Sequence, residues 1–151
     1  MRFLIQRVKG ASVEVEHKEI GRIGQGLLVF VGVGQGDDEA VADAMIRKLL
    51  SLRIFEDENG KTNLSIRDVG GELLIVSQFT LYADCSHGNR PGFTLAGAPD
   101  VAERLYEYVI AGCALEIATV RHGEFGADMQ VQLINDGPFT ILLDSAEVVR
   151  K

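Results

Sequence analysis

Alternating apolar and polar residues open the chain. Residues 2–16 alternate around a break at Gly10, with valines on one face and glutamates on the other, and this pattern predicts a bent strand with one buried face. Residues 17–24 predict a strand that returns beside it as a hairpin. The run 27–33 is apolar throughout, which is typical of a strand buried on both faces.

Two segments have helical spacing instead. Apolar residues recur every three or four positions in residues 38–52, where Asp37 or Asp38 can cap the first turn. Pro99 suits the first turn of a second helix, because its missing N–H would have no acceptor there. The predicted buried stripes are Val41, Met45, Leu49 and Leu52 in the first helix, and Val101, Leu105, Tyr108 and Val109 in the second. Each stripe covers one face, so both helices are expected to pack on a sheet.

The remaining apolar runs predict further strands. Residues 55–63 contain a tight-turn signal, and the later strands are expected at residues 72–82, 114–121, 129–134 and 139–143. Asn135-Asp-Gly-Pro138 is a row of turn-favouring residues, which predicts a turn between the last two strands. Hairpins interrupted by two helices indicate a single α+β domain over residues 1–151, with a mostly antiparallel sheet or barrel and two main helices.

Composition narrows the classes of function. The chain has 151 residues with 46% hydrophobic and 25% charged side chains, the profile of a globular domain that can bury its own core. The N-terminus lacks the continuous apolar segment of a signal peptide, and no apolar run approaches the roughly 20 residues of a membrane span. We therefore expect a cytoplasmic protein that binds no membrane.

Charge and cysteine usage limit the partners. The net charge of −7 counts against a protein that holds RNA mainly by neutralising phosphates. An acidic enzyme can still act on the end of a tRNA if it grips only the terminal nucleotide and the amino acid. Cys85 and Cys113 show no C-x-x-C or other zinc-ligand spacing, so we expect reduced thiols and no metal.

Two motif-like features carry little weight. Gly32-Val-Gly-Gln-Gly36 lies between a strand and a helix like a dinucleotide-binding loop, but the third glycine of G-x-G-x-x-G would fall at Asp37. The charge of Asp37 would repel a pyrophosphate and would cap the helix instead. His17, His87 and His122 lie far apart and in no hydrolase motif. A triad assembled in space stays open, although exposed histidines explain the pattern better.

Polar residues interrupt an apolar run at Ser77-Gln-Phe-Thr80. In a strand that continues to residue 82, one face would hold Ser77, Phe79 and Leu81, and the other Gln78, Thr80 and Tyr82. Mixed polarity where a strand leaves the core is a common way to line a pocket. A strand that simply reaches the surface explains the pattern equally well.

These polar segments carry a resemblance to a known family. The matching segments are Gln6-Arg-Val8, Leu52-Arg-Ile-Phe-Glu-Asp57, Ser77-Gln-Phe-Thr-Leu-Tyr-Ala-Asp84, Asn89-Arg-Pro91, Phe125-Gly-Ala-Asp-Met129 and Asn135-Asp-Gly-Pro-Phe-Thr140. Together they resemble the D-aminoacyl-tRNA deacylase family essentially from end to end. One departure is Gly92, where the family often has serine.

The resemblance implies an ester hydrolase that frees D-amino acids, and glycine, from mischarged tRNA without a metal or an organic cofactor. It implies catalytic candidates at Ser77, Gln78, Phe79 and Thr80, and substrate-binding candidates at Phe125, Met129, Gly137 and Pro138. The expected partners are the 3′ end of aminoacyl-tRNA and a second copy of the chain, and DNA is not expected.

The Gly137-Pro138 pair is implied to be joined by a cis bond and to reach into the pocket of the other subunit. Its two carbonyl oxygens would then occupy the place of an L side chain. D- and L-residues differ only in the direction of Cβ, so exclusion of the wrong enantiomer discriminates without reading the side chain. Glycine has no Cβ to exclude, and glycyl-tRNA would therefore remain a substrate.

The mode of attack on the ester stays open. Backbone N–H groups near Phe79 and Thr80 are candidates to stabilise the oxyanion, and one such donor is typically worth about 3–4 kcal/mol. Thr80 has no adjacent His or Lys to activate it, so we favour a water assisted by the 2′-hydroxyl of the terminal ribose. The alternatives are an esterase or peptidase with Thr80, Ser77 or Cys85 as covalent nucleophile, and a non-catalytic dimeric binding module.

Overall fold

The first strand organises the sheet of this protein, which a computed structural model describes over residues 1–149. β1 (Arg2–Val15) pairs along one edge with β8 (Met129–Asp144) for its whole length. Along its other edge it pairs first with β3 (Gly26–Gly32) and then with β2 (Lys18–Ile23). All three pairings are antiparallel, and together they require the bend that the sequence predicts in β1.

The sheet continues on the far side of β3 with parallel strands. β6 (Glu72–Ser77) lies parallel to β3, and β7 (Val120–His122) lies parallel to β6. β2 curls round until Gly21 faces β7, where a Cβ on Gly21 would lie 3.4 Å from Cβ of Arg121. The sheet is therefore mixed and nearly closed into a barrel, whereas the sequence indicates a mostly antiparallel one.

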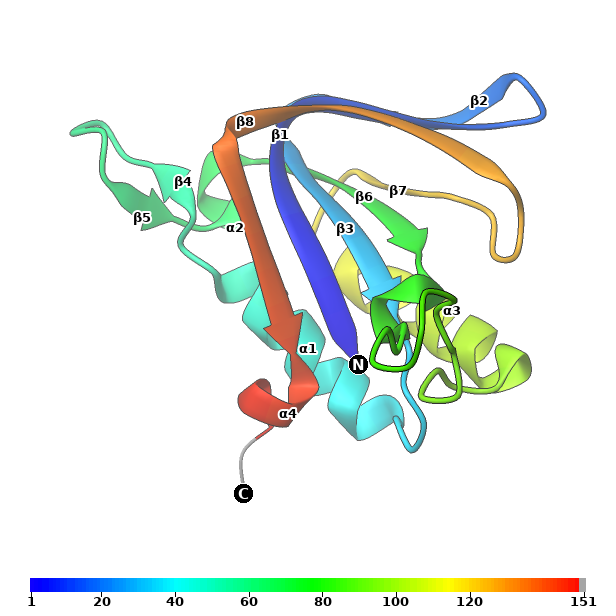
Figure 1. The fold of residues 1–151 in the computed structure, drawn as a ribbon. Helices are drawn as coiled ribbons and strands as arrows, with labels where there is room; N and C mark the ends of the chain where they lie inside the picture. The colour runs from blue at the N-terminus through cyan, green and yellow to red at the C-terminus, as the bar shows by residue number, and fades with distance from the viewer. Residues whose placement is uncertain (150–151) are drawn as a thin grey trace.

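Two long helices cover one face of the sheet (Figure 1). They are α1 (Glu39–Ser51) and α3 (Pro99–Ala114). The smaller elements are the hairpin β4 (Phe55–Glu56) and β5 (Thr62–Leu64), the helices α2 (Ile66–Val69) and α4 (Ser145–Val148), and the 3-10 helix η1 (Phe79–Tyr82). This arrangement confirms the α+β class with two main helices. The last two residues of the domain predicted over 1–151 lie outside the described residues.

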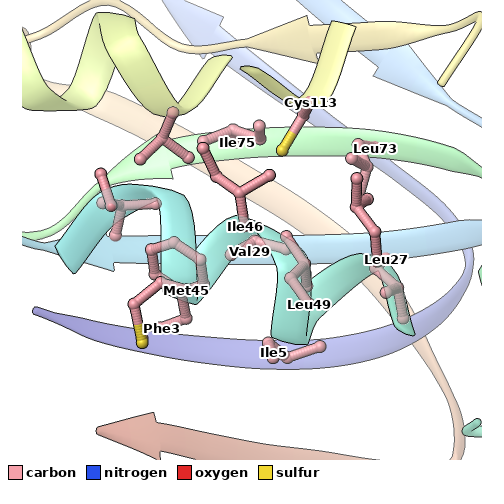
Figure 2. Close-up of a cluster of buried hydrophobic side chains, with 14 of the residues drawn as sticks. Phe3, Ile5, Leu27, Val29, Met45, Ile46, Leu49, Leu73, Ile75 and Cys113 are labelled. Atoms are coloured by element: carbon pink, nitrogen blue, oxygen red, sulfur yellow. The ribbon is translucent and has the colours of Figure 1, made fainter. Parts of the chain in front are cut away.

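The main core lies between the sheet and these helices. Figure 2 shows Met45 and Leu49 of α1 pointing at Phe3 and Val29 of the central strands. A second cluster fills the inside of the curled sheet and consists of Val8, Ala11, Val13, Ile23, Leu28, Leu74 and Val76. Strands β3 and β6 contribute to both clusters, which explains why their sequences are apolar on both faces.

The helices follow the predicted stripes with small rotations. In α1 the buried residues are Ala42, Met45, Ile46, Leu49 and Leu50, with Val41 and Leu52 at the border. In α3 the buried tyrosine is Tyr106, whereas Tyr108 is half-buried and donates a hydrogen bond to Asp43. The structure confirms Asp38 as the cap of α1, because its carboxylate accepts from the N–H of Val41 at 2.9 Å.

Asp37 has a different role from the one predicted. Its Oδ2 accepts from the N–H of Gly34 and pairs with the ammonium group of Met1, both at 2.7 Å. Its carboxylate therefore joins the loop after β3 to the start of β1, and the predicted cap at this residue is wrong.

Three predicted strand boundaries are also wrong. The strand expected over residues 114–121 is limited to β7, because α3 continues to Ala114. The strand expected over residues 72–82 ends at Ser77 and is followed by η1. The turn expected at residues 135–138 is absent, and β8 runs through it without a break. The last two differences involve the predicted site.

Candidate active site

A pocket of about 760 Å³ opens where β6 leaves the sheet. Its walls come from Val31 and Val76 on the strands, Phe79 on η1, Phe125 in the segment after β7, and Met129 at the start of β8. The loop at residues 93–98 and the first turns of α3 close the other side. The pocket therefore gathers segments that are far apart in sequence around Ser77 and Gln78.

The chain turns at Ser77 because of two glycines on the neighbouring strand and the loop after it. The N–H of Gln78 donates to the carbonyl of Val31 at 2.8 Å, and η1 starts directly afterwards. A Cβ on Gly32 would lie 3.0 Å from Cβ of Leu81, and one on Gly34 would lie within 3 Å of the Tyr82 ring. Only glycine allows η1 to pack so closely.

The polar groups of Ser77–Thr80 now lie on a turn and not on two faces of a strand, so the predicted alternation is wrong. Gln78 donates a hydrogen bond to Oγ of Thr80 at 2.5 Å. Phe79 is 57% exposed and packs edge-on against Phe93, with 4.9 Å between ring centroids. As the first residues of η1, Phe79 and Thr80 carry N–H groups that have no acceptor within the helix.

Tyr106 forms part of the pocket from α3. Its buried hydroxyl donates to the carbonyl of Ile75 at 2.8 Å, and the N–H of Gly123 donates to the same carbonyl at 3.0 Å. Burial raises the pKa of Tyr106 far above its ordinary value, so its hydroxyl stays neutral. Among the described residues that line the pocket, none has a charged side chain. The pocket thus offers hydroxyls, amides and apolar surface.

The second predicted polar segment lies outside this pocket. Asn135 fixes its shape, because Asn135 Oδ1 accepts from the N–H of Phe139 at 2.6 Å and Asn135 Nδ2 donates to Oγ1 of Thr140 at 3.0 Å. The bond between Gly137 and Pro138 is cis, and both residues are exposed. Neither residue lines the pocket of its own chain.

Comparison with known proteins identifies the family. The family model described as D-Tyr-tRNA(Tyr) deacylase matches residues 4–144. The D-aminoacyl-tRNA deacylase of Thermosipho africanus (strain TCF52B) is 55% identical over 148 residues, which cover 98% of this chain and 99% of that protein. The chain belongs to the D-aminoacyl-tRNA deacylase family. It is accordingly an enzyme that hydrolyses the ester of an aminoacyl-tRNA.

Other similar proteins also align over nearly the whole chain. The D-aminoacyl-tRNA deacylase of Clostridioides difficile (strain 630) is 53% identical over 147 residues, covering 97% of this chain and 99% of the relative. The solved structure of a protein named c-Myc DNA Unwinding Element Binding Protein is 41% identical, with a TM-score of 0.89 over 95% of this chain and 98% of that protein. The resemblance seen in the sequence motifs is therefore confirmed.

The predicted site residues of the deacylase separate into two groups. Ser77, Gln78, Phe79, Phe125 and Met129 line the pocket, and Thr80 is bonded to Gln78 beside them. Gly137 and Pro138 form the second group, on β8. The other candidates lie elsewhere, because Cys85, His17, His87 and His122 do not line the pocket. Within residues 1–149 there is no cluster of three potential metal ligands and no helix that could cross a membrane.

Arg7 contacts the second predicted segment, and sequence reasoning did not single it out. It is only 6% exposed, and its guanidinium donates to the carbonyl of Asp136 at 2.9 Å and to that of Ile54 at 2.7 Å. The guanidinium also lies over the ring of Phe139, 4.6 Å from the centroid. Arg7 therefore holds both sides of the Gly137-Pro138 segment. An arginine in an alternating strand gives no sign of burial, although its place in the motif Gln6-Arg-Val8 could have drawn attention to it.

Proposed function

We propose that the pocket at the end of β6 binds the aminoacyl end of a D-aminoacyl-tRNA or glycyl-tRNA, and that Gly137 and Pro138 of a second subunit complete it. The observation that carries this proposal is the separation of the two polar segments. The chain builds a pocket from Ser77, Gln78 and Phe79, and it presents Gly137 and Pro138 on an exposed surface away from that pocket.

An excluding gate made of backbone suits the conformation of this segment. Gly137 has a φ of 144°, and a Cβ there would lie 3.0 Å from the nitrogen of Phe139 and 3.2 Å from Nη2 of Arg7. A side chain at this position would therefore be strained and crowded, which leaves the two carbonyl oxygens as the groups that a substrate meets. Such a gate rejects an L side chain by position and places no demand on the D side chain. Glycine passes the gate because it has no Cβ.

A homodimer is supported by the surface of β8. β8 pairs only with β1 within the described residues, so its second edge is free. Ile134 and Leu142 on this strand are 64% and 54% exposed. Leu142 lies opposite Leu4, which in turn lies opposite Phe30 on β3. This apolar row, Leu4–Phe30–Leu142, crosses three strands on the face away from the helices. A free edge next to exposed apolar residues is the kind of surface that a second subunit covers.

The pocket lining also bears on the chemistry. Because the described lining residues include no carboxylate, histidine or lysine, we expect the base that activates water to come from the substrate, as its 2′-hydroxyl. The N–H groups of Phe79 and Thr80 are our candidates for binding the oxyanion. Mischarged tRNA arises where proteins are synthesised, so we propose that the enzyme acts in the cytoplasm.

The first experiment compares matched D-, L- and glycyl-esters of one tRNA with the purified enzyme. We expect fast release of the D-amino acid, release of glycine, and retention of the L-ester. Rapid quenching followed by mass spectrometry should detect no acyl group on the protein. A trapped acyl-enzyme would instead establish a covalent mechanism, and equal rates for the D- and L-esters would refute the chiral gate.

The second experiment tests the shared site with mixed dimers. One chain carries Ala127→Trp, which fills the pocket, and the other carries Gly137→Val, which disrupts the gate. The Ala127→Trp homodimer should be inactive, and the Gly137→Val homodimer should lose its discrimination between D- and L-esters. If the site is shared, the mixed dimer joins the open pocket of the Gly137→Val chain to the intact gate of the Ala127→Trp chain, so mixing should restore D-selective deacylation at one site. Failure to restore this selectivity in a confirmed mixed dimer would show that the site lies within one chain.

A further inference from the structure

Arg2 connects three parts of the molecule at the end of the sheet. Its Nε donates to Oδ2 of Asp144 at 2.9 Å, at the end of β8. Its Nη1 donates to the carbonyl of Leu81 at 2.8 Å, within η1. Its guanidinium also lies over the ring of Tyr82, 4.5 Å from the centroid. Arg2 is far from Thr80 in sequence and lies in none of the segments that resemble the deacylase family.

The contact with Leu81 fixes the end of a very short helix. η1 has four residues, and its internal hydrogen bonds run from Leu81 to Gln78 at 3.2 Å and from Ala83 to Thr80 at 3.0 Å. A 3-10 turn of this length has little stability of its own. Its position must therefore come from contacts made by its side chains and end groups.

Two sets of contacts hold η1. Gly32 and Gly34 receive Leu81 and the Tyr82 ring from the β3 side, and Arg2 binds the carbonyl of Leu81 and covers the same ring. Asp144 holds Arg2 in turn, and its own carboxylate also accepts from the N–H of Ala146. This series of contacts extends from the last residue of β8 to the residue next to Thr80.

We propose that Arg2 is a positioning residue of the deacylase, which sets the place of η1 and hence of the N–H groups of Phe79 and Thr80. The proposal rests on the assignment of η1 to the active site. It also explains why an arginine is needed. The planar guanidinium reaches a carboxylate and a carbonyl with different nitrogens while it stacks on an aromatic ring, whereas the ammonium of a lysine cannot do all three.

The test uses Arg2→Met, which keeps most of the aliphatic stem and removes both hydrogen bonds. A displacement of about 1 Å at a reacting group can cost on the order of a hundredfold in rate. We therefore expect kcat for the D-aminoacyl ester to fall by about tenfold to a hundredfold, with KM within about threefold of wild type. Arg2→Lys should recover only part of the loss.

A second readout is independent of activity. Amide hydrogen exchange at Leu81 and Ala83 reports directly on the bonds of η1. Exchange at both amides should accelerate in Arg2→Met and, to a smaller extent, in Asp144→Asn. Arg104→Met is the matched control, because Arg104 pairs with Glu39 between the two long helices and does not contact η1. It should change neither kcat nor exchange at these amides.

The outcomes separate the proposals. If Arg2→Met lowers thermal stability but keeps wild-type kcat and wild-type exchange in η1, Arg2 is merely structural and the inference is wrong. Should Arg2→Met fail to fold, Arg2→Lys and Asp144→Asn carry the same test, and wild-type kcat and exchange in both variants refute the inference. If the wild-type enzyme itself does not release D-amino acids from tRNA, the proposed function fails, while the exchange result still tests whether Arg2 orders η1.

Discussion

The polar segments at residues 77–80 and 135–140 give the same sequence signal but form different structures. Each interrupts an apolar run with polar and small residues. The first ends its strand and turns into η1, where it lines a pocket of its own chain. The second leaves its strand intact and displays Gly137 and Pro138 on the surface.

The neighbouring strand decides between the two outcomes. β3 ends beside Ser77, and the glycines at its end leave room for η1 to fold over it. β1, in contrast, continues past the polar segment of β8 and pairs with it on both sides. The register shifts on either side of Val8 absorb the irregular residues. Polar residues thus mark where the apolar run of a strand is broken in the sequence. The neighbouring strand determines whether the strand ends there.

The two regions also differ in what holds them. η1 is held by close packing on glycines, by the hydrogen bond from partly exposed Arg2 to the carbonyl of Leu81, and by an exposed hydrogen bond between Gln78 and Thr80. The 135–140 segment is held by the buried cation of Arg7. Loss of a buried charged partner is expected to cost far more than loss of an exposed hydroxyl, and the following experiments test this contrast.

The largest effect is expected from Arg7→Met. This change removes the donors that Arg7 supplies to the carbonyls of Asp136 and Ile54 and removes the cation beside Phe139. We expect the free energy of unfolding in urea to fall by roughly 3–5 kcal/mol. Arg104→Met, which removes an exposed ion pair, should cost less than about 1 kcal/mol. Equal losses in the two variants would contradict a special role of Arg7.

Gly137→Ala should have the next largest effect. The added methyl group would meet Arg7 and Phe139 at a φ of 144°, and this strain is expected to cost roughly 1–3 kcal/mol. If this strain adds to the activation free energy, turnover of the D-ester should fall by about fivefold to about 150-fold, because each 1.4 kcal/mol corresponds to about tenfold in rate. The L-ester should also become a measurable substrate.

Gly36→Ala provides the control for Gly137→Ala. Gly36 has a φ of 82° but nothing within 4 Å of the position of a Cβ, so it reports on backbone strain alone. This variant should be destabilised without any change in the ratio of D to L turnover. If Gly137→Ala kept that ratio as well, the gate would have to lie elsewhere.

Thr80→Ala should have a smaller effect, because the hydroxyl that it removes is exposed and bonds to Gln78. The backbone N–H groups of η1 remain. A neutral hydrogen bond contributes about 0.5–1.5 kcal/mol, so kcat should fall by about tenfold or less. Loss of a covalent nucleophile would instead lower kcat by about a millionfold, and steady-state kinetics with the D-ester distinguish the two cases.

Thiol modification should have the smallest effect on activity. Burial in α3 raises the pKa of Cys113 to about 12, so its thiolate is scarce at pH 8, whereas Cys85 is exposed. Iodoacetamide should label one thiol in the native enzyme and two after denaturation. Deacylation should continue after labelling, because Cys85 does not line the pocket. Inactivation that follows labelling at Cys85 would favour the covalent alternative.

Local sequence determined the elements with strong periodicity. The first strand with its bend, the return strand, the apolar third strand and both long helices lie where their patterns predict them. Capping chemistry located the start of α1 at Asp38, and Pro99 marked the start of α3. These features depend on residues within a few positions of one another, so a single sequence contains the information that fixes them.

The site motifs were visible in the sequence, but their arrangement was not. Ser77, Gln78, Phe79, Phe125 and Met129 come from the motifs that indicated the family, and all five line one pocket. Tyr106 and Arg7 could not be found in this way. Each donates hydrogen bonds to backbone carbonyls of distant segments. Every residue has such a carbonyl, so the residue type does not show which one accepts.

The sequence by itself determined which motif residues are chemically equipped and where the strongly periodic strands and helices lie. Tertiary structure alone decided that β6 stops at Ser77 while β8 continues through Pro138. The outcome depends on where the neighbouring strands β3 and β1 end, and not on the residues of β6 or β8 themselves. Tertiary structure also decided that Arg7 is buried and that Gly137 faces outward. Both depend on which backbone groups the fold brings within hydrogen-bonding distance, and that is a property of the assembled sheet.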